Sequence, residues 1–428
     1  MLACSPASSG VSRVADGGAE TGATGDIDAA SDARVDGSTG PITEGGAEDS
    51  AEGPDVARPA DPCLEEGGCA PGTWTDVTPS SVNLTTGDCG NYGTKGVQVD
   101  PSRPQDIYAE LNCQGIWKST DYGQTWNGPI NSGQNGAAVG DCAGSIAIAR
   151  SPAYPDAILY ESCIRGAGLG FWRSTNGGVD WTSMSVLPDG GAASAANQQF
   201  YTPAVDPYDA NHLLMSQHTT DVLVESTDGG QTWTNVVLAP AMITAGDTGG
   251  IDFIDTGNPS TTRGTWLWLS AASAGTWRTS DGGATWTQVE TNEHVAGSMH
   301  SEVYQPAPAT SGVIYMAGEY STSGSGVLLS MDWGQTWTHV GLDQPESIVI
   351  GTPKHLYAMF GWAIGAGQTV DPSLEVGDVP GTGTWASPGT PPAMTQGPGQ
   401  AAVTSDGTNE IILVGDYNAG LWRYVEAE

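Results

Sequence analysis

A short pattern of residues recurs at nearly even intervals along most of the chain, and this periodicity constrains the fold more than any other feature. The pattern is Ser or Thr, any residue, Asp or Asn, any residue, Gly, any residue, Thr or Asp, and finally Trp. Its five copies end at Trp126, Trp181, Trp233, Trp286 and Trp337. Trp74 and Trp385 extend the series without the acidic residue, so successive tryptophans lie 48 to 55 residues apart. Such a period indicates a chain built from repeated structural units.

Each repeat contains short apolar segments separated by Gly and Pro turns. In the first repeat, the segments 97–99 and 107–109 flank such a turn, and Gly115-Ile116-Trp117 then precedes the recurring pattern. Four short strands per repeat predict an all-β propeller. Counting first strands gives seven repeats, so we expect a single seven-bladed β-propeller. The last repeat lacks a fourth strand, which we expect residues 72–77 to supply, closing the ring and removing an exposed sheet edge.

The recurring pattern resembles the Asp box, also called the BNR repeat. The resemblance covers residues 74–428 and extends to the sialidase and xyloglucan hydrolase-like propellers. In such a turn the Asp carboxylate accepts backbone N–H groups, and the Gly takes a backbone conformation that other residues resist. The Trp then anchors the outer strand between neighbouring sheets. The boxes are therefore expected to be structural.

Residues 1–72 differ in composition from the rest of the chain. They contain 14 acidic and 3 basic residues, and all 32 aromatic residues follow Thr73. Because such a segment buries too little apolar surface to offset its chain entropy, we predict a disordered linker over 1–72 and the propeller over 73–428. The start, Met1-Leu2-Ala3-Cys4, resembles the end of a bacterial lipoprotein signal, which makes Cys4 a candidate lipid-attachment site. The alternative is an N-terminal cysteine without this role.

The charge of the chain excludes several classes of partner. There are 49 acidic and 13 basic residues, giving a net charge of −36, and only three lysines. Nucleic acids and anionic membrane surfaces need clustered Lys and Arg, so neither is an expected partner. No run of 18 apolar residues is present to form a transmembrane segment. We expect a monomer at the outer surface of a bacterium, anchored by lipid or secreted.

Six cysteines besides Cys4 indicate an oxidising compartment. Cys89 and Cys113 occupy the loops before the first strand and after the second strand of one blade, and Cys142 and Cys163 repeat this relation one blade later. We therefore predict the disulfides Cys89–Cys113 and Cys142–Cys163, with Cys63–Cys69 in the linker. No CxxC motif or His/Cys cluster indicates a metal site. No cofactor is expected, although the acidic loops leave a structural calcium ion open.

The ends of the second strands define a ring of polar positions on one face of the predicted propeller. The ring and the aromatic residues that follow it consist of Asn112, His218, Glu319, Asp416, Tyr320, Trp362 and Tyr417. Aromatic rings stack on sugar C–H faces, and paired carboxylates perform the acid–base steps of glycoside hydrolysis. Glu319 and Asp416 form the preferred catalytic pair. The alternative is that these polar residues only cap strand ends in exposed loops.

Further candidates lie near the same face. Glu302 and Asp252 are additional catalytic candidates, because a carboxylate on an inner strand can be buried with a raised pKa. His300 and Arg165 are candidate substrate-binding residues. The segment 362–384, rich in Gly, Asp and Pro, is expected to be a long loop that overhangs this face. Each of these residues has an ordinary structural alternative.

The families that share the repeat differ in what they require. Sialidases use three arginines, one of them in an Arg-Ile-Pro motif that this sequence lacks. In the xyloglucan hydrolases, a Tyr-Ala-Arg-Thr-Asp-x-Gly-Gly stretch supplies a catalytic Asp. The similar stretch here is 108–115, and it places Asn112 at the position of that Asp. Two functions therefore stay open: a glycoside hydrolase-like protein acting on neutral polysaccharide, or a non-catalytic scaffold that binds glycan or protein.

Overall fold

The computed structural model describes most of the repeat region. The residues described are 70–84, 94–111, 113–151, 156–186, 198–217, 220, 222–243, 250–269, 275–291, 303–306, 311–317, 326–342, 348–360, 373–379, 384–394, 398–416 and 420–426. All of them belong to the unit Val56–Glu428, and Met1–Asp55 forms a separate unit. No helix in the described part of the chain is long and apolar enough to cross a membrane.

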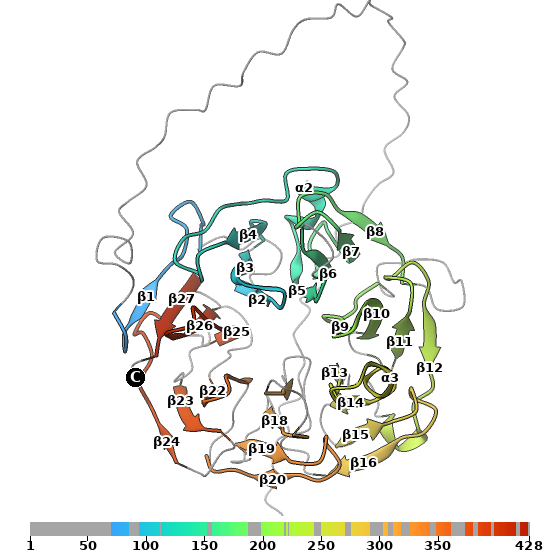
Figure 1. Cartoon of the computed structure of the whole chain (residues 1–428). Helices are drawn as coiled ribbons and strands as arrows, with labels where there is room; N and C mark the ends of the chain where they lie inside the picture. The colour runs from blue at the N-terminus through green and yellow to red at the C-terminus, as the bar shows by residue number, and fades with distance from the viewer. Residues whose placement is uncertain are drawn as a thin grey trace, which may run out of the picture. The chain divides into compact units, whose positions relative to one another are not determined.

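Seven antiparallel sheets follow one another around a ring, which confirms the predicted all-β seven-bladed propeller (Figure 1). The strands of blades one to three are β2 (Thr94–Asp100), β3 (Arg103–Leu111) and β4 (Ile116–Ser119); β5 (Ala143–Ala149), β6 (Ile158–Arg165), β7 (Gly170–Ser174) and β8 (Thr182–Met184); and β9 (Ala204–Asp206), β10 (Asp209–Ser216), β11 (Leu223–Ser226) and β12 (Thr234–Val236). Those of blades four and five are β13 (Gly250–Phe253), β14 (Trp266–Leu269), β15 (Thr276–Thr279) and β16 (Thr287–Glu290); and β17 (Val303–Tyr304), β18 (Ile314–Ala317), β19 (Val327–Ser330) and β20 (Thr338–His339).

The ring closes through the last two blades. Their strands are β21 (Ile348–Gly351), β22 (His355–Phe360), β23 (Ser373–Asp378) and β24 (Trp385–Ala386); and β25 (Pro398–Ser405), β26 (Glu410–Asp416), β27 (Gly420–Val425) and β1 (Trp74–Asp76). As predicted, the first strand of the chain completes the last blade, with Trp74 opposite Tyr424. Their rings lie 5.1 Å apart. Among the described residues, the connections between strands contain three short helices, α2 (Gly136–Val139), η4 (Pro240–Met242) and α3 (Pro259–Thr262).

The core lies between the blades rather than within any one of them. Seven apolar clusters of described residues each join two neighbouring sheets. On β18, Ile314 and Met316 pack against blade four, whereas Tyr315 and Ala317 pack against blade six. Because both faces of a second strand are covered, these strands are mostly apolar, and several of the polar side chains within them are buried.

The Asp-box turns have the predicted chemistry. Asp121 accepts hydrogen bonds from the Ser119 hydroxyl at 2.7 Å and from the Thr125 backbone N–H at 2.9 Å. Gly123 has a φ of +79°, and its N–H donates to the Ser119 hydroxyl at 2.9 Å. The corresponding acceptors in the other boxes are Asn176, Asp228, Asp281 and Asp332. The hydroxyl-bearing residue and the Asp thus fix the turn locally.

One expectation about the loops is wrong. The segment 362–384 was expected to be a single long loop, but β23 lies within it and pairs along the whole of β22. This strand lacks the Gly-x-Trp sequence of the other third strands. Instead of that sequence, β23 has the buried Leu374 between two polar neighbours, and this leucine forms part of the apolar face of the strand. The insertion between the second and third strands is accordingly shorter than the sequence suggested.

Candidate functional site

Most of the predicted ring lies outside the described residues. This holds for Asn112, His218, His300, Glu302, Glu319, Tyr320, Trp362 and Tyr417, and also for Cys4, Cys63, Cys69 and Cys89. Their roles remain predictions. Arg165 is placed by its backbone at the end of β6.

The two predicted carboxylates that the structure describes lie in different blades. Asp416 ends β26, where it is fully buried and pairs across the sheet with Gly420. Asp252 is half-buried on β13, and burial raises the pKa of its carboxyl to about 7. Blades four and seven are not neighbours in the ring, so these two residues do not form a side-by-side pair.

The disulfide prediction is confirmed for blade two. Cys142 and Cys163 are bonded and join the start of β5 to β6. Cys113 also forms a disulfide, while its predicted partner Cys89 lies outside the described residues. The confirmed bond stiffens the end of blade two that faces the predicted ring.

Two buried glutamates, which sequence reasoning missed, meet between blades one and two. Glu110 on β3 is 2% exposed and Glu161 on β6 is fully buried. Burial raises the pKa of Glu161 well above its ordinary value, and the adjacent Glu110 carboxyl adds to this effect. Glu161 Oε1 also lies 3.1 Å from the sulfur of Cys142. The signal was available, because a Glu interrupts an otherwise apolar second strand in two successive repeats.

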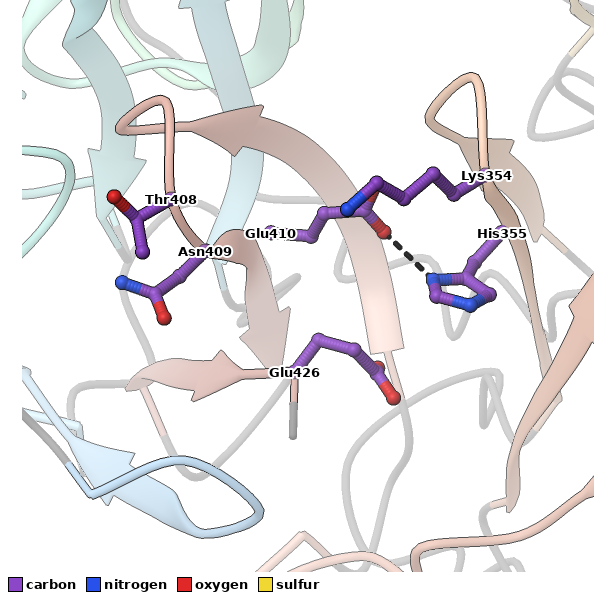
Figure 2. A pocket seen from close by; sticks show the side chains of 6 residues that line it. All are labelled: Lys354, His355, Thr408, Asn409, Glu410 and Glu426. Atoms are coloured by element: carbon purple, nitrogen blue, oxygen red, sulfur yellow. Dashed lines mark hydrogen bonds and ion pairs between the residues drawn. The ribbon is translucent and has the colours of Figure 1, made fainter. Parts of the chain in front are cut away.

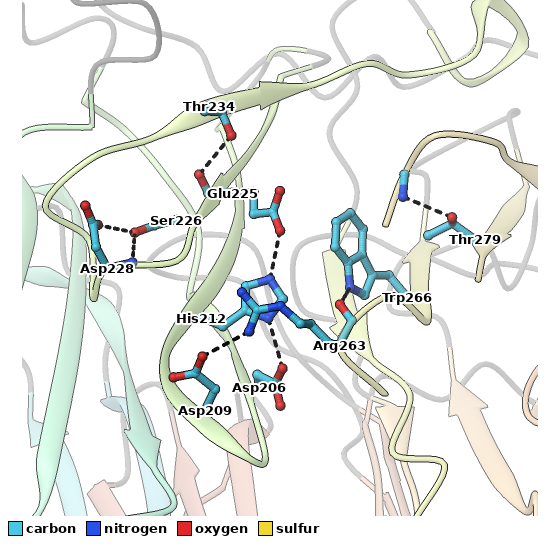
Figure 3. A network of polar contacts seen from close by, with 11 residues as sticks. Asp206, Asp209, His212, Glu225, Ser226, Asp228, Thr234, Arg263, Trp266 and Thr279 are labelled. Carbon is cyan, nitrogen blue, oxygen red and sulfur yellow. Dashed lines mark hydrogen bonds and ion pairs between the residues drawn. The ribbon is translucent and has the colours of Figure 1, made fainter. Parts of the chain in front are cut away.

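A second buried network surrounds His212 (Figure 3). Its Nδ1 lies 2.9 Å from Asp206 and its Nε2 lies 2.9 Å from Glu225. Burial acts to lower the pKa of His212, but the two carboxylate partners outweigh it and raise the pKa. The fully buried imidazole therefore links β9, β10 and β11 through its hydrogen bonds, which is a structural role.

A polar cleft opens where blades six and seven meet (Figure 2). One part has a volume of about 210 Å³ and is lined by Lys354, His355, Thr408, Asn409, Glu410 and Glu426. The other part has a volume of about 340 Å³, and its lining includes Trp385, Asp378 and Ser387. His355 and Glu426 line both parts, so the two parts are adjacent and share a wall.

The two glutamates of the cleft differ in their surroundings. Although burial acts to raise the pKa of Glu410, hydrogen bonds from Thr352, His355 and Tyr357 hold it below its ordinary value. His355 Nδ1 and the Tyr357 hydroxyl lie 2.9 Å and 2.8 Å from Glu410 Oε2. Burial raises the pKa of Glu426, and the nearby Glu410 charge raises it further. His355 and a hydrogen bond from Tyr357 act in the opposite direction but do not outweigh the burial. The cleft thus holds one firmly ionised carboxylate beside one that retains its proton to higher pH.

Comparison with known proteins relates the repeats to a family of enzymes. No family model matches the chain. A stretch of 173 residues is 27% identical to the xyloglucanase Xgh74A of Acetivibrio thermocellus, covering 35% of this chain. The chain is an Asp-box propeller related to the GH74 xyloglucanases. The match spans only 20% of the length of that relative.

Solved structures show that this Asp-box propeller has a widely used fold. The GH74 xyloglucanase of Xanthomonas campestris superposes with a TM-score of 0.56 at 18% identity, over 82% of this chain and 53% of that one. A structure of YCF48 bound to D1 peptide superposes with a TM-score of 0.52 at 12% identity, over 83% of this chain and 97% of that one. At these identities the likeness concerns the fold, and function must be argued from the site.

Proposed function

We propose that this Asp-box propeller acts on a neutral polysaccharide as a glycoside hydrolase-like protein. The observation that carries the proposal is the sequence similarity to xyloglucanase Xgh74A. The net charge of −36 supports a neutral rather than an acidic substrate, because uronate-rich chains would be repelled.

The raised pKa of Asp252 supports the hypothesis that this residue is catalytic. A carboxyl with a pKa of about 7 still carries its proton in much of the population at neutral pH, as the general acid of a glycosidase must. It belongs to β13, the innermost strand of blade four (Figure 1). Asp416, the other predicted carboxylate that the structure describes, ends the second strand of blade seven with its side chain buried.

A second function, non-catalytic binding, is favoured by one residue. Asn112 occupies the position that resembles the catalytic Asp of the xyloglucan hydrolases, and an amide does not act as a general acid or base near neutral pH. A propeller with this change would still present a face to a glycan or a protein. YCF48, whose fold is similar, has been solved bound to a peptide.

An extracellular or cell-surface location is part of the proposal. The Cys142–Cys163 bond supports it, since disulfides persist mainly in oxidising compartments. Lipid attachment at Cys4 would be tested by mass spectrometry of the protein isolated from its native membrane.

The experiment measures release of reducing ends by the full chain from xyloglucan, mixed-linkage glucan and polygalacturonate. The variants Asp252→Asn, Asp416→Asn and Glu319→Gln run in parallel, with thermal unfolding as the control for folding. Cleavage of a neutral glucan that is lost in one of these variants supports the hydrolase. Binding without cleavage selects the glycan-binding scaffold. If the chain neither binds nor cleaves any of these polysaccharides, the hydrolase and the glycan-binding scaffold are both refuted.

A further inference from the structure

The cleft between blades six and seven lies apart from the face used in the proposed function. His355 and Glu410 are the first residues of β22 and β26, whereas Asp416 is the last residue of β26. Six strand steps separate Glu410 from Asp416, which is about 20 Å. A ligand in this cleft would therefore occupy a site of its own on the opposite side of the propeller.

One oxygen of the cleft lacks a protein partner. Oε2 of Glu426 is buried and has no hydrogen-bond partner among the described residues. Leaving such an acceptor without a donor is unfavourable, so a ligand hydroxyl that reaches it through a rotation of the carboxyl is favoured. Glu410, in contrast, is already satisfied by His355 and Tyr357. The Tyr357 hydroxyl also acts on Glu426, but this carboxyl is less fully satisfied than Glu410 and is therefore the better acceptor for a ligand.

The larger part of the cleft has an aromatic wall. Trp385 lies across Gly377 of β23, where a Cβ atom would come within 2.8 Å of the indole. Its Nε1 donates to the Val340 carbonyl at 2.9 Å, which fixes the orientation of the ring. The half-buried indole lines the cleft together with Asp378 and Ser387. An immobilised aromatic ring beside hydrogen-bonding groups suits a ligand that is both flat-faced and rich in hydroxyls.

We propose that the cleft binds a neutral sugar unit, stacked on Trp385 and donating hydroxyl hydrogen bonds to Glu426 and Asp378. The inference rests on the proposed polysaccharide substrate and assigns it a second contact, away from the proposed catalytic face. Glu410, Glu426 and Asp378 outnumber the basic groups Lys354 and His355, so an acidic sugar would be repelled. A second contact on one chain raises the effective concentration of polysaccharide at the first.

The direct test is protection of His355 from diethylpyrocarbonate in the full chain, followed by peptide mass spectrometry. The His355 side chain is 32% exposed, so it is open to the reagent when the cleft is empty. Cellohexaose at ten times its Kd should slow modification about tenfold. His339, exposed on β20, is the matched control and should be unaffected. Equal rates at His355 with and without cellohexaose would overturn the proposal, as would equal protection by an oligogalacturonate.

Variants separate this proposal from the proposed function. Glu426→Gln and Trp385→Ala should each weaken cellohexaose binding at least about tenfold, measured by calorimetry. Trp286→Ala is the matched control, because Trp286 holds the same repeat position and donates to a backbone carbonyl at 3.3 Å in blade four. If both cleft variants bind cellohexaose as tightly as the wild type and the protein still cleaves polysaccharide, the cleft proposal is overturned and the proposed function stands. If Asp416→Asn abolishes cleavage while cellohexaose still protects His355, the two sites have separate roles and the cleft proposal is supported.

Discussion

The buried pair Glu110 and Glu161 makes the stability of the propeller depend on pH in a defined direction. In the unfolded chain a glutamate titrates near pH 4.3. In the folded protein, burial and the neighbouring Glu110 carboxyl raise the pKa of Glu161 well above its ordinary value. Between these two pKa values the native state holds a proton that the unfolded state has released. The stabilisation is complete below about pH 4.3 and is lost as the pH rises through the folded pKa of Glu161.

The magnitude follows from this one proton. Within the window, the free energy of unfolding should fall by about 1.4 kcal/mol for each pH unit. Glu161→Gln keeps the shape of the side chain and places a neutral amide beside Glu110, so that the Glu161 proton no longer contributes. We expect the variant to lose this slope, and to be relatively more stable than the wild type as the pH rises.

The assay is urea unfolding followed by tryptophan fluorescence at each pH unit from 5 to 8, with the disulfides intact. Glu290→Gln, on the outer strand β16, is the matched control and should keep the slope of the wild type. The double variant with Glu110→Gln removes the second carboxyl of the pair. A Glu161→Gln protein that retains the full slope of the wild type would refute the reasoning.

Three further predictions concern other parts of the ring. Asp252→Asn should reduce the rate of glycan cleavage at least about a hundredfold. The wild-type rate should decline above about pH 7 as the Asp252 carboxyl loses its proton, and a cleavage rate that does not change with pH would exclude Asp252 as the general acid. His212→Gln should destabilise the fold by about 3–5 kcal/mol in urea unfolding near pH 6, because it leaves two carboxylates without their cation. The penalty should shrink as the pH rises through the raised pKa of His212, and an equal penalty at every pH would count against a charged His212. Gly123→Ala should lower the melting temperature more than Gly407→Ala. Both glycines have a φ of about +80° to +90°, but only a Cβ at Gly123 would meet a side chain, at 2.5 Å from Leu413. Equal shifts in melting temperature would show that this clash has no effect.

The sequence by itself determined the architecture. Turn chemistry and strand alternation are encoded within each repeat of about 50 residues, so five Asp boxes sufficed to predict four-stranded units. In the part of the chain that the structure describes, six of the seven sheets have the four predicted strands, whereas blade one has three and continues only as an isolated bridge between Lys118 and Asn127. The closing role of residues 72–77 followed from the missing strand of the last repeat, and the register of Trp74 with Tyr424 confirms it. The Cys142–Cys163 bond was equally predictable, since both cysteines occupy defined positions in one repeat.

Only the tertiary structure decided which side chains of different repeats meet. Glu110 and Glu161 are 51 residues apart in sequence, and nothing local indicates that they face each other between two blades. The cleft likewise combines His355 with Glu410 and Glu426, whose contact depends on how two sheets pack. Segment 373–378 became a strand because the ladder of β22 was available to pair with it. Local patterns fix the fold of each unit, whereas burial, pKa and cavities arise from the contact between units, which no single repeat encodes.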